Sequence, residues 1–159
     1  MDDAARKAAA ADGKAGPVVV AVADSARARL FEADGPNAPL REVESLSNAE
    51  ARLHEGDLVT DTAGRMRDRP FEAGHSAFGG DSAKRHRAED FAALACRSIA
   101  RILRRSRARR LYLVAEPDFL GLLRQRMDPA VRRCVAGEVV KSIAGEPASR
   151  IRTVLPERL

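Results

Sequence analysis

Basic side chains at the two ends of segment 57–87 could bind phosphate groups. A guanidinium group offers paired hydrogen bonds to phosphate oxygens, and nearby glycines let the main chain approach a ligand closely. The segment shows no apolar period beyond 57–60, so we predict a long loop, which compact domains keep mainly for function. Its candidate nucleic-acid-binding residues are Arg65, Arg67, Arg69, Gly79, Gly80, Lys84, Arg85 and Arg87.

An alternative for this segment stays open. Acidic residues alternate with the basic ones and partly cancel their field, so the segment could also be a solvated, flexible loop. The carboxylates concerned are those of Asp57, Asp61, Asp68, Glu72 and Asp81.

A denser basic cluster follows the loop. Asp and Glu are absent between Asp90 and Glu116, whereas arginines crowd the second half of this stretch. Cations at the C-terminus of a helix interact favourably with its macrodipole, which accounts for some of them. The remaining charge predicts an anion-binding surface. Its candidate residues are Arg101, Arg104, Arg105, Arg107, Arg109 and Arg110.

No residue pattern in the sequence indicates catalysis. Asp24, Asp57 and Asp61 could converge on a magnesium ion and form a nuclease site, but their spacing does not require it. A simpler role for Asp24 is to satisfy main-chain groups in the turn after the first strand. Cys96 and Cys134 lack metal-site spacing and are expected to be buried, reduced thiols, and the histidines are too scattered for a zinc site. We therefore predict a non-enzymatic protein with no cofactor and no metal.

The composition allows several kinds of partner. The chain has 159 residues and a formal net charge of +5, which is compatible with nucleic acid, an anionic surface or an acidic protein. Aromatic residues make up only 4% and tryptophan is absent. Both facts argue against binding of single-stranded RNA by stacking of its bases on exposed rings.

We expect one domain over residues 17–159, preceded by a disordered tail over residues 1–16. The tail begins acidic and has no apolar stretch of the kind that a secretory signal contains. No run approaches the ~18 apolar residues of a membrane span, so we expect a cytoplasmic protein.

Apolar periodicity predicts strands first and then alternating helices and strands. An antiparallel meander opens the chain, and its third strand is expected at an edge because one of its faces is charged. After the loop the period changes to that of a helix. The predicted strands are 18–23, 28–33, 40–46, 111–115 (in the centre of the sheet) and 135–143, and the predicted helices are 48–54, 88–105, 116–127, 128–131 and 149–155. This order is typical of an α/β fold with a mixed sheet and helices packed on it.

Five segments together resemble the bacterial host attachment protein family. They read VVVAVADSARARLFEAD, LREVESLSNAEAR, DLVTDTAGR, AEDFAALACRSIARIL and LYLVAEPDFLGLLRQRM, and they cover nearly the whole chain from Pro17 onward. The resemblance implies a role in the attachment of bacteria to host cells. It also implies a fold similar to the middle domain of archaeal and eukaryotic peptide-chain release factors.

In those release factors the loop before the long helix carries Gly-Gly-Gln, whose glutamine helps to position the attacking water. The corresponding residues here are Gly79, Gly80 and Asp81. An ionised aspartate only accepts hydrogen bonds, and it would bring negative charge toward RNA. The resemblance therefore implies the architecture, with ribosomal or transfer RNA as a partner, but not release activity.

These observations predict a non-enzymatic protein that binds ribosomal or transfer RNA through the loop and the arginine cluster. One alternative is a protein-interaction module with acidic partners that affects attachment indirectly. The other is the magnesium-dependent nuclease.

Overall fold

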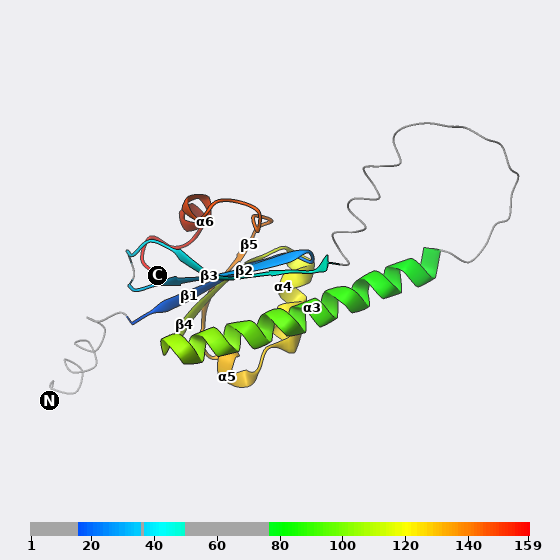
Figure 1. Cartoon of the computed structure of the whole chain (residues 1–159), viewed down its shortest axis with the longest axis horizontal. Helices are drawn as coiled ribbons and strands as arrows, with labels where there is room; N and C mark the ends of the chain where they lie inside the picture. The colour runs from blue at the N-terminus through cyan, green and yellow to red at the C-terminus, as the bar shows by residue number, and fades with distance from the viewer. Residues whose placement is uncertain (1–15, 36, 50–76) are drawn as a thin grey trace, which may run out of the picture.

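A mixed β-sheet forms the centre of the protein (Figure 1). The computed structural model describes residues 16–35, 37–49 and 77–159. The strands of this part are β1 (Val18–Ala23), β2 (Arg27–Ala33), β3 (Arg41–Ser47), β4 (Arg110–Ala115) and β5 (Val135–Val140). They lie in the order β3-β2-β1-β4-β5, with β1, β2 and β3 antiparallel and with β4 parallel to both β1 and β5. The predicted mixed sheet, opening with an antiparallel meander, is confirmed.

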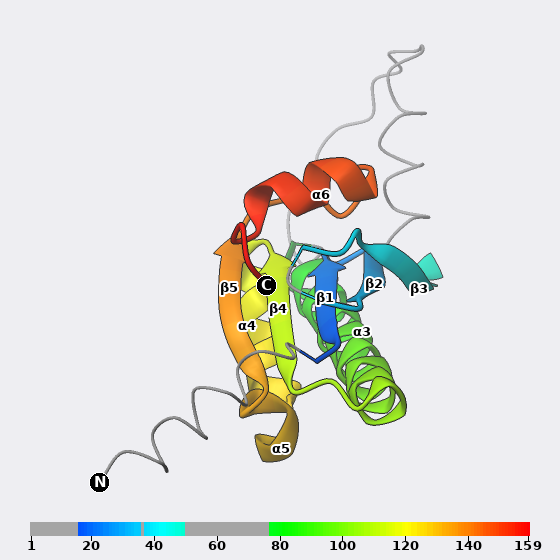
Figure 2. The ribbon, with the colours of Figure 1, turned by 90° about the vertical axis from the view of Figure 1, so that its left-hand side faces the viewer.

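Helices cover both faces of the sheet (Figure 2). In the described part of the chain these are α3 (Ala77–Ser106), α4 (Pro117–Arg126), α5 (Pro129–Arg132) and α6 (Ala148–Val154). The first three pack on one face, and α6 packs on the other. Each face has its own apolar cluster, so the fold has three layers and two cores.

Strands β1 and β4 are buried on both faces, which explains their unbroken apolar sequences. Along β1, Val18, Val20 and Val22 face the α6 side, and Val19 and Ala21 face the α3 side. The predicted central position of the strand at 111–115 is confirmed, because β4 lies between β1 and β5.

Strand β3 is at an edge of the sheet, as predicted, but its simple alternation is interrupted. The register between β2 and β3 shifts between Leu30 and Phe31. As a result Glu44 lies opposite Leu30 and accepts a hydrogen bond from Ser98 of α3. Glu42 lies opposite Phe31 and accepts a hydrogen bond from Arg29 on the other face of the sheet. Both carboxylates of the strand thus have basic partners, one on each face of the sheet.

Other predicted boundaries need small corrections. The last strand ends at Val140 and not at residue 143, and Ile143 instead packs against the cluster on the α6 side. The predicted helix at 48–54 lies almost wholly outside the described residues, as do segment 57–76 and the predicted tail. Gly16, the one described residue of that tail, accepts a hydrogen bond from Arg110.

The prediction that the loop extends to residue 87 is wrong, because α3 begins at Ala77 and not at residue 88. Residues 80–86 are exposed, and Figure 1 shows this end of α3 running past the sheet. A helical turn that contacts no core needs no apolar stripe, so periodicity could not reveal it. Pairs four residues apart support the turn: Arg85 lies 3.3 Å from Glu89, and His86 lies 3.7 Å from Asp90.

Replacing Gly80 with Ala should stabilise the first turns of α3 by up to ~1 kcal/mol, because glycine is a poor residue for a helix interior. A Cβ atom at Gly80 would meet nothing within 4 Å. Amide hydrogen exchange of residues 81–86 should slow in the variant. Unchanged exchange would favour the loop predicted from the sequence.

Candidate nucleic-acid interface

Helix α3 carries or adjoins most of the basic residues singled out in the sequence. It has 30 residues and is therefore about 45 Å long. Its first three turns contain Gly79, Gly80, Lys84, Arg85 and Arg87, and its last turns contain Arg101, Arg104 and Arg105. The helix is followed by Arg107, Arg109 and Arg110. Arg65, Arg67 and Arg69 lie outside the described residues. The nearest members of the two basic groups, Arg87 and Arg101, are about 21 Å apart along the helix, so the fold does not bring the groups together.

The basic residues at the start of α3 line a cleft of about 1150 Å³ between α3 and α4. Lys84, Arg85 and Arg87 contribute positive charge, and Asp81, Glu116 and Asp118 contribute an equal negative charge. Glu116 immediately follows β4, so the cleft opens at the carboxyl end of the parallel strands, where ligands commonly bind in open α/β sheets.

Within this cleft the cations are not equally available. Arg85 and Arg126 share the carboxylate of Glu89, at 3.3 and 3.1 Å. Lys84 is exposed and forms no salt bridge with any residue that the structure describes. Lys84 is therefore a cation of this cleft that pairs with no carboxylate of the described chain.

At the other end of α3, two arginines join the helix to the sheet. Arg101 lies 2.5 Å from Glu44, and Arg105 lies 3.1 Å from Glu32. Glu44 also accepts a hydrogen bond from Ser98, at 2.8 Å, and Glu32 also pairs with Arg41. These two arginines anchor the helix on β3 and β2, and their guanidinium groups are already paired with carboxylates.

Arg110 is a third structural arginine. Its guanidinium donates to the main-chain oxygen of Leu159, at 2.5 Å, and to that of Gly16, at 3.4 Å. It therefore joins the start of β4 to the segment after α6. Half of the predicted arginine cluster serves the fold.

Arg104, Arg107 and Arg109 form the remaining group, here called the arginine triad. All three are exposed, and none forms a salt bridge with a residue in the described ranges. Their guanidinium groups keep their full hydrogen-bonding capacity for a ligand. Among the residues predicted from the sequence, this triad is the group best placed to contact phosphate.

Arg107 has an unusual main-chain conformation. Its φ of 56° is the one positive value at a non-glycine residue in the described chain. The amide of Arg107 donates to Arg104 O and that of Ala108 to Leu103 O, which closes α3 with the paired bonds of a Schellman motif. Glycine is usual at this position, and a side chain there costs about 1 kcal/mol or more. Arginine at such a position indicates a role for its side chain.

Arg97 was missed in the sequence. It is exposed on α3, and its spacing of four and seven residues from Arg101 and Arg104 places it on the same side of the helix. That spacing was the available signal.

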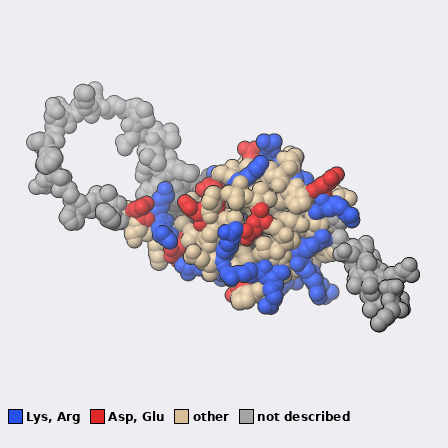
Figure 3. Space-filling model, turned by 180° about the vertical axis from the view of Figure 1, so that it is seen from behind, with Lys and Arg blue, Asp and Glu red and all other residues tan. Residues whose placement is uncertain are grey.

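Seen from behind, Lys and Arg side chains gather along the lower edge of the molecule, whereas Asp and Glu are scattered (Figure 3).

Aromatic side chains are not available for base stacking in the described part of the chain. Phe31, Phe91, Tyr112 and Phe119 are all buried, and Phe91 packs against Phe119. Stacking of bases on these four rings is therefore excluded.

The carboxylates that anchor α3 predict a pH dependence of stability. Burial alone would raise the pKa of Glu44, but its hydrogen bonds with Ser98 and Arg101 outweigh this and hold it below the ordinary value of 4.5. As the pH falls, Glu44 is therefore protonated in the unfolded chain before it is protonated in the folded protein. Its contribution to stability is present above pH 4.5 and is lost as the pH falls through the pKa of the folded protein. Urea unfolding measured from about pH 6 to about pH 3, the range in which carboxylates titrate, gives the free energy of unfolding at each pH. This free energy should fall less steeply with pH in Glu44→Gln than in the wild type. Equal slopes would contradict the role of Glu44.

Metal binding finds no support among the described residues, where no group of three or more His, Cys, Asp or Glu side chains could hold an ion. Asp24 accepts the amides of Ala26, at 2.8 Å, and Arg27, at 2.7 Å, so its predicted role in the turn is confirmed. Asp57 and Asp61 lie outside the described residues.

The two cysteines are free thiols; Cys96 is buried, as predicted, whereas Cys134 is only half-buried. Burial raises the pKa of Cys96 to about 11, so this thiol stays protonated near neutral pH.

Comparison with known proteins gives one family and one fold. The family described as "Protein required for attachment to host cells" matches residues 19–155. No curated protein matches the chain. Among solved structures, an archaeal translation termination factor is similar with a TM-score of 0.50 and 8% identity. The similarity covers 84% of this chain and 34% of that factor, so the chain spans about a third of its length. At this identity the likeness shows the fold alone, and it confirms the predicted release-factor-like architecture.

None of the helices in the described ranges is long and apolar enough to cross a membrane.

Proposed function

The chain belongs to the family of proteins required for attachment to host cells, and on this premise we propose that it acts as a non-enzymatic protein that binds ribosomal or transfer RNA along α3. The observation that carries the proposal is the arginine triad. Arg101, Arg105 and Arg110 all have partners within the fold. The three exposed guanidinium groups of the arginine triad, in contrast, have no carboxylate partner in the described chain.

The length of α3 favours an extended polyanion. Lys84 and the arginine triad lie at opposite ends of a helix about 45 Å long, so a small anion could reach only one of them. A folded RNA presents phosphates over that distance, and cations contact them without reading sequence. The buried aromatic rings favour contacts with the RNA backbone rather than with unstacked bases.

The fold supports RNA as a partner only by analogy, since the similar structure is a translation termination factor. The residues do not support release chemistry. Gly79 and Gly80 lie within α3, and Asp81 follows them where the release factors have glutamine. An effect on attachment to host cells would then be indirect, through translation in the cytoplasm.

A protein-interaction module is the second candidate, and the cleft between α3 and α4 favours it. Lys84 and Arg85 line this cleft together with Glu116, Asp118 and the partly buried Leu122. Carboxylates at a phosphate-binding site would oppose binding, whereas a protein surface with both charges could match them. In this proposal a partner engages the cleft and the arginine triad binds its acidic residues.

Co-sedimentation with ribosomes, measured over a range of salt concentrations, tests the RNA proposal. Association should be clear at low salt and should weaken steeply as salt rises, because each phosphate contact releases a bound counterion. No association at low salt would end the proposal. Incubation of RNA with the protein and magnesium should leave the RNA intact, and cleavage would instead support the nuclease.

A further inference from the structure

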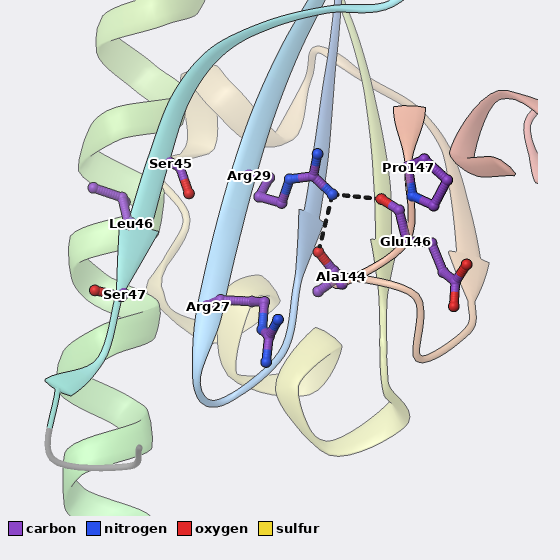
Figure 4. A pocket seen from close by; sticks show the side chains of 9 residues that line it. Arg27, Arg29, Ser45, Leu46, Ser47, Ala144, Glu146 and Pro147 are labelled. Atoms are coloured by element: carbon purple, nitrogen blue, oxygen red, sulfur yellow. Dashed lines mark hydrogen bonds between the residues drawn. The ribbon is translucent and has the colours of Figure 1, made fainter. Parts of the chain in front are cut away.

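A second candidate binding site lies on the opposite face of the sheet from α3. A cavity of about 430 Å³ opens there between the β2–β3 pair and segment 144–147, which leads into α6 (Figure 4). Arg27 and Arg29 of β2 line it together with Ser45 and Ser47 of β3. These residues take no part in the proposed RNA interface.

Arg29 builds one wall of the cavity. Its guanidinium pairs with Glu42, at 2.6 Å, and donates to the main-chain oxygens of Ala144, at 3.2 Å, and Glu146, at 2.5 Å (Figure 4). The hydrogen bond from Arg29 lowers the pKa of Glu42, which keeps that carboxylate ionised. Arg29 therefore fixes segment 144–147 against the sheet and has little capacity left for a ligand.

Arg27 is different because its donors are unused. Its side chain is 44% exposed, and its one salt-bridge partner among the described residues is Asp24, 3.8 Å from Nε. Asp24 itself already accepts two main-chain amides. The guanidinium of Arg27 makes no hydrogen bond in the described chain, so its Nη atoms remain free toward the cavity.

Gly145 makes room for this guanidinium. A Cβ atom at position 145 would lie 3.2 Å from Arg27 Nη1, which is closer than such atoms normally approach. The absence of a side chain at Gly145 thus lets Arg27 lie against segment 144–147, where Figure 4 places it.

Two serines of β3 lie beside these arginines. Ser47 lies directly across from Arg27 in the β2–β3 pair, and Ser45 lies across from Arg29. Directly paired residues have Cβ atoms about 5 Å apart on the same face of the sheet. Both serines are exposed, and neither hydroxyl has a hydrogen-bond partner in the described chain.

We propose that this cavity binds the phosphate group of a small organic phosphate, through Arg27 with Ser45 and Ser47. A guanidinium group donates two parallel hydrogen bonds to two oxygens of either a phosphate or a carboxylate. A phosphate has further oxygens, to which neighbouring hydroxyl groups could donate, whereas a carboxylate has none. The carboxylate of Glu146 points away from Arg27 in Figure 4 and leaves this space open. The volume is within the range of small-molecule sites.

Titration of the full chain with inorganic phosphate, followed by NMR, tests this site. The Arg27 Nε–H signal and the amides of Ser45, Ser47 and Gly145 should shift and saturate, with a Kd of about 1 mM. Adenosine monophosphate should bind at least as tightly, and acetate should bind at least about tenfold more weakly, a difference of about 1.4 kcal/mol. Absence of saturable shifts, equal binding of acetate, or exclusion of the nucleotide would each overturn the proposal.

Matched variants separate this site from general charge effects and from RNA binding. Arg27→Gln should raise the Kd for phosphate about tenfold or more, and Gly145→Ala should raise it by displacing the guanidinium. Arg150→Gln removes the same charge from exposed α6 and should leave the Kd unchanged. Arg27→Gln should also leave ribosome association unchanged, so the two proposals can fail separately. A Kd that Arg27→Gln does not change would refute the assigned site.

Discussion

Removal of the arginine triad should weaken RNA binding by about tenfold or more and should reduce its dependence on salt. The variant Arg104→Gln, Arg107→Gly, Arg109→Gln deletes three exposed cations without partners in the described chain. Each lost phosphate contact lowers the slope of log K against log salt by about 1, so the slope should fall by about 3. Binding of transfer RNA, measured at several salt concentrations, gives both quantities.

Lower stability should not explain the expected loss, because the three side chains are exposed and make no salt bridge in the described chain. Glycine suits the positive φ of Arg107, so the substitution there should raise stability by up to about 1 kcal/mol. The loss of cations at the C-terminus of α3 offsets part of this gain, so thermal unfolding should show a variant about as stable as the wild type. A variant that binds less RNA and remains folded locates the effect in the side chains.

The matched control is Lys141→Gln, Arg150→Gln, Arg158→Gln. It removes the same number of charges from exposed positions after β5 and on or after α6. If binding depends on net charge alone, the two variants should lose affinity equally, and α3 would then not be the interface. Unchanged binding of the control together with weak binding of the triad variant supports it.

The sequence predicts the sheet well because its signals are local. Continuous apolar runs such as Val18–Ala23 arise only where both faces are buried, and turn residues such as Asp24 mark where strands end. The start of α3 could not be predicted in this way. Residues 80–86 are exposed, and a Gly79–Gly80 pair argues against a helix, so the signal there is weak.

The arginine cluster shows the same limit for a site. Six arginines in one stretch are equivalent in the sequence, yet three of them bind partners that lie far away in the chain. Arg105 pairs with Glu32, Arg101 with Glu44, and Arg110 with Leu159 O. Such pairings depend on which strand packs beside the helix, and only the fold specifies that. The three arginines without such a partner in the described chain form the arginine triad.

The largest effect on stability is expected from Ile151→Ala on α6. Ile151 is fully buried and is the one buried residue of this seven-residue helix. So short a helix is not stable alone, and it depends on packing against the sheet. Deletion of a buried Ile side chain to Ala costs about 2–5 kcal/mol, which is a large share of the stability of a single domain.

The graded control is Ile151→Val, which should cost only about 0.5–1.5 kcal/mol because it removes one methylene group. Urea unfolding of both variants measures the difference. Since α6 and segment 144–147 cover the β2 face, Ile151→Ala should also weaken phosphate binding at Arg27 while sparing RNA binding at the triad on the other face. Equal costs for the two substitutions would show that α6 does not hold this side of the sheet. The phosphate pocket would then have to be built by Arg29 and its hydrogen bonds alone.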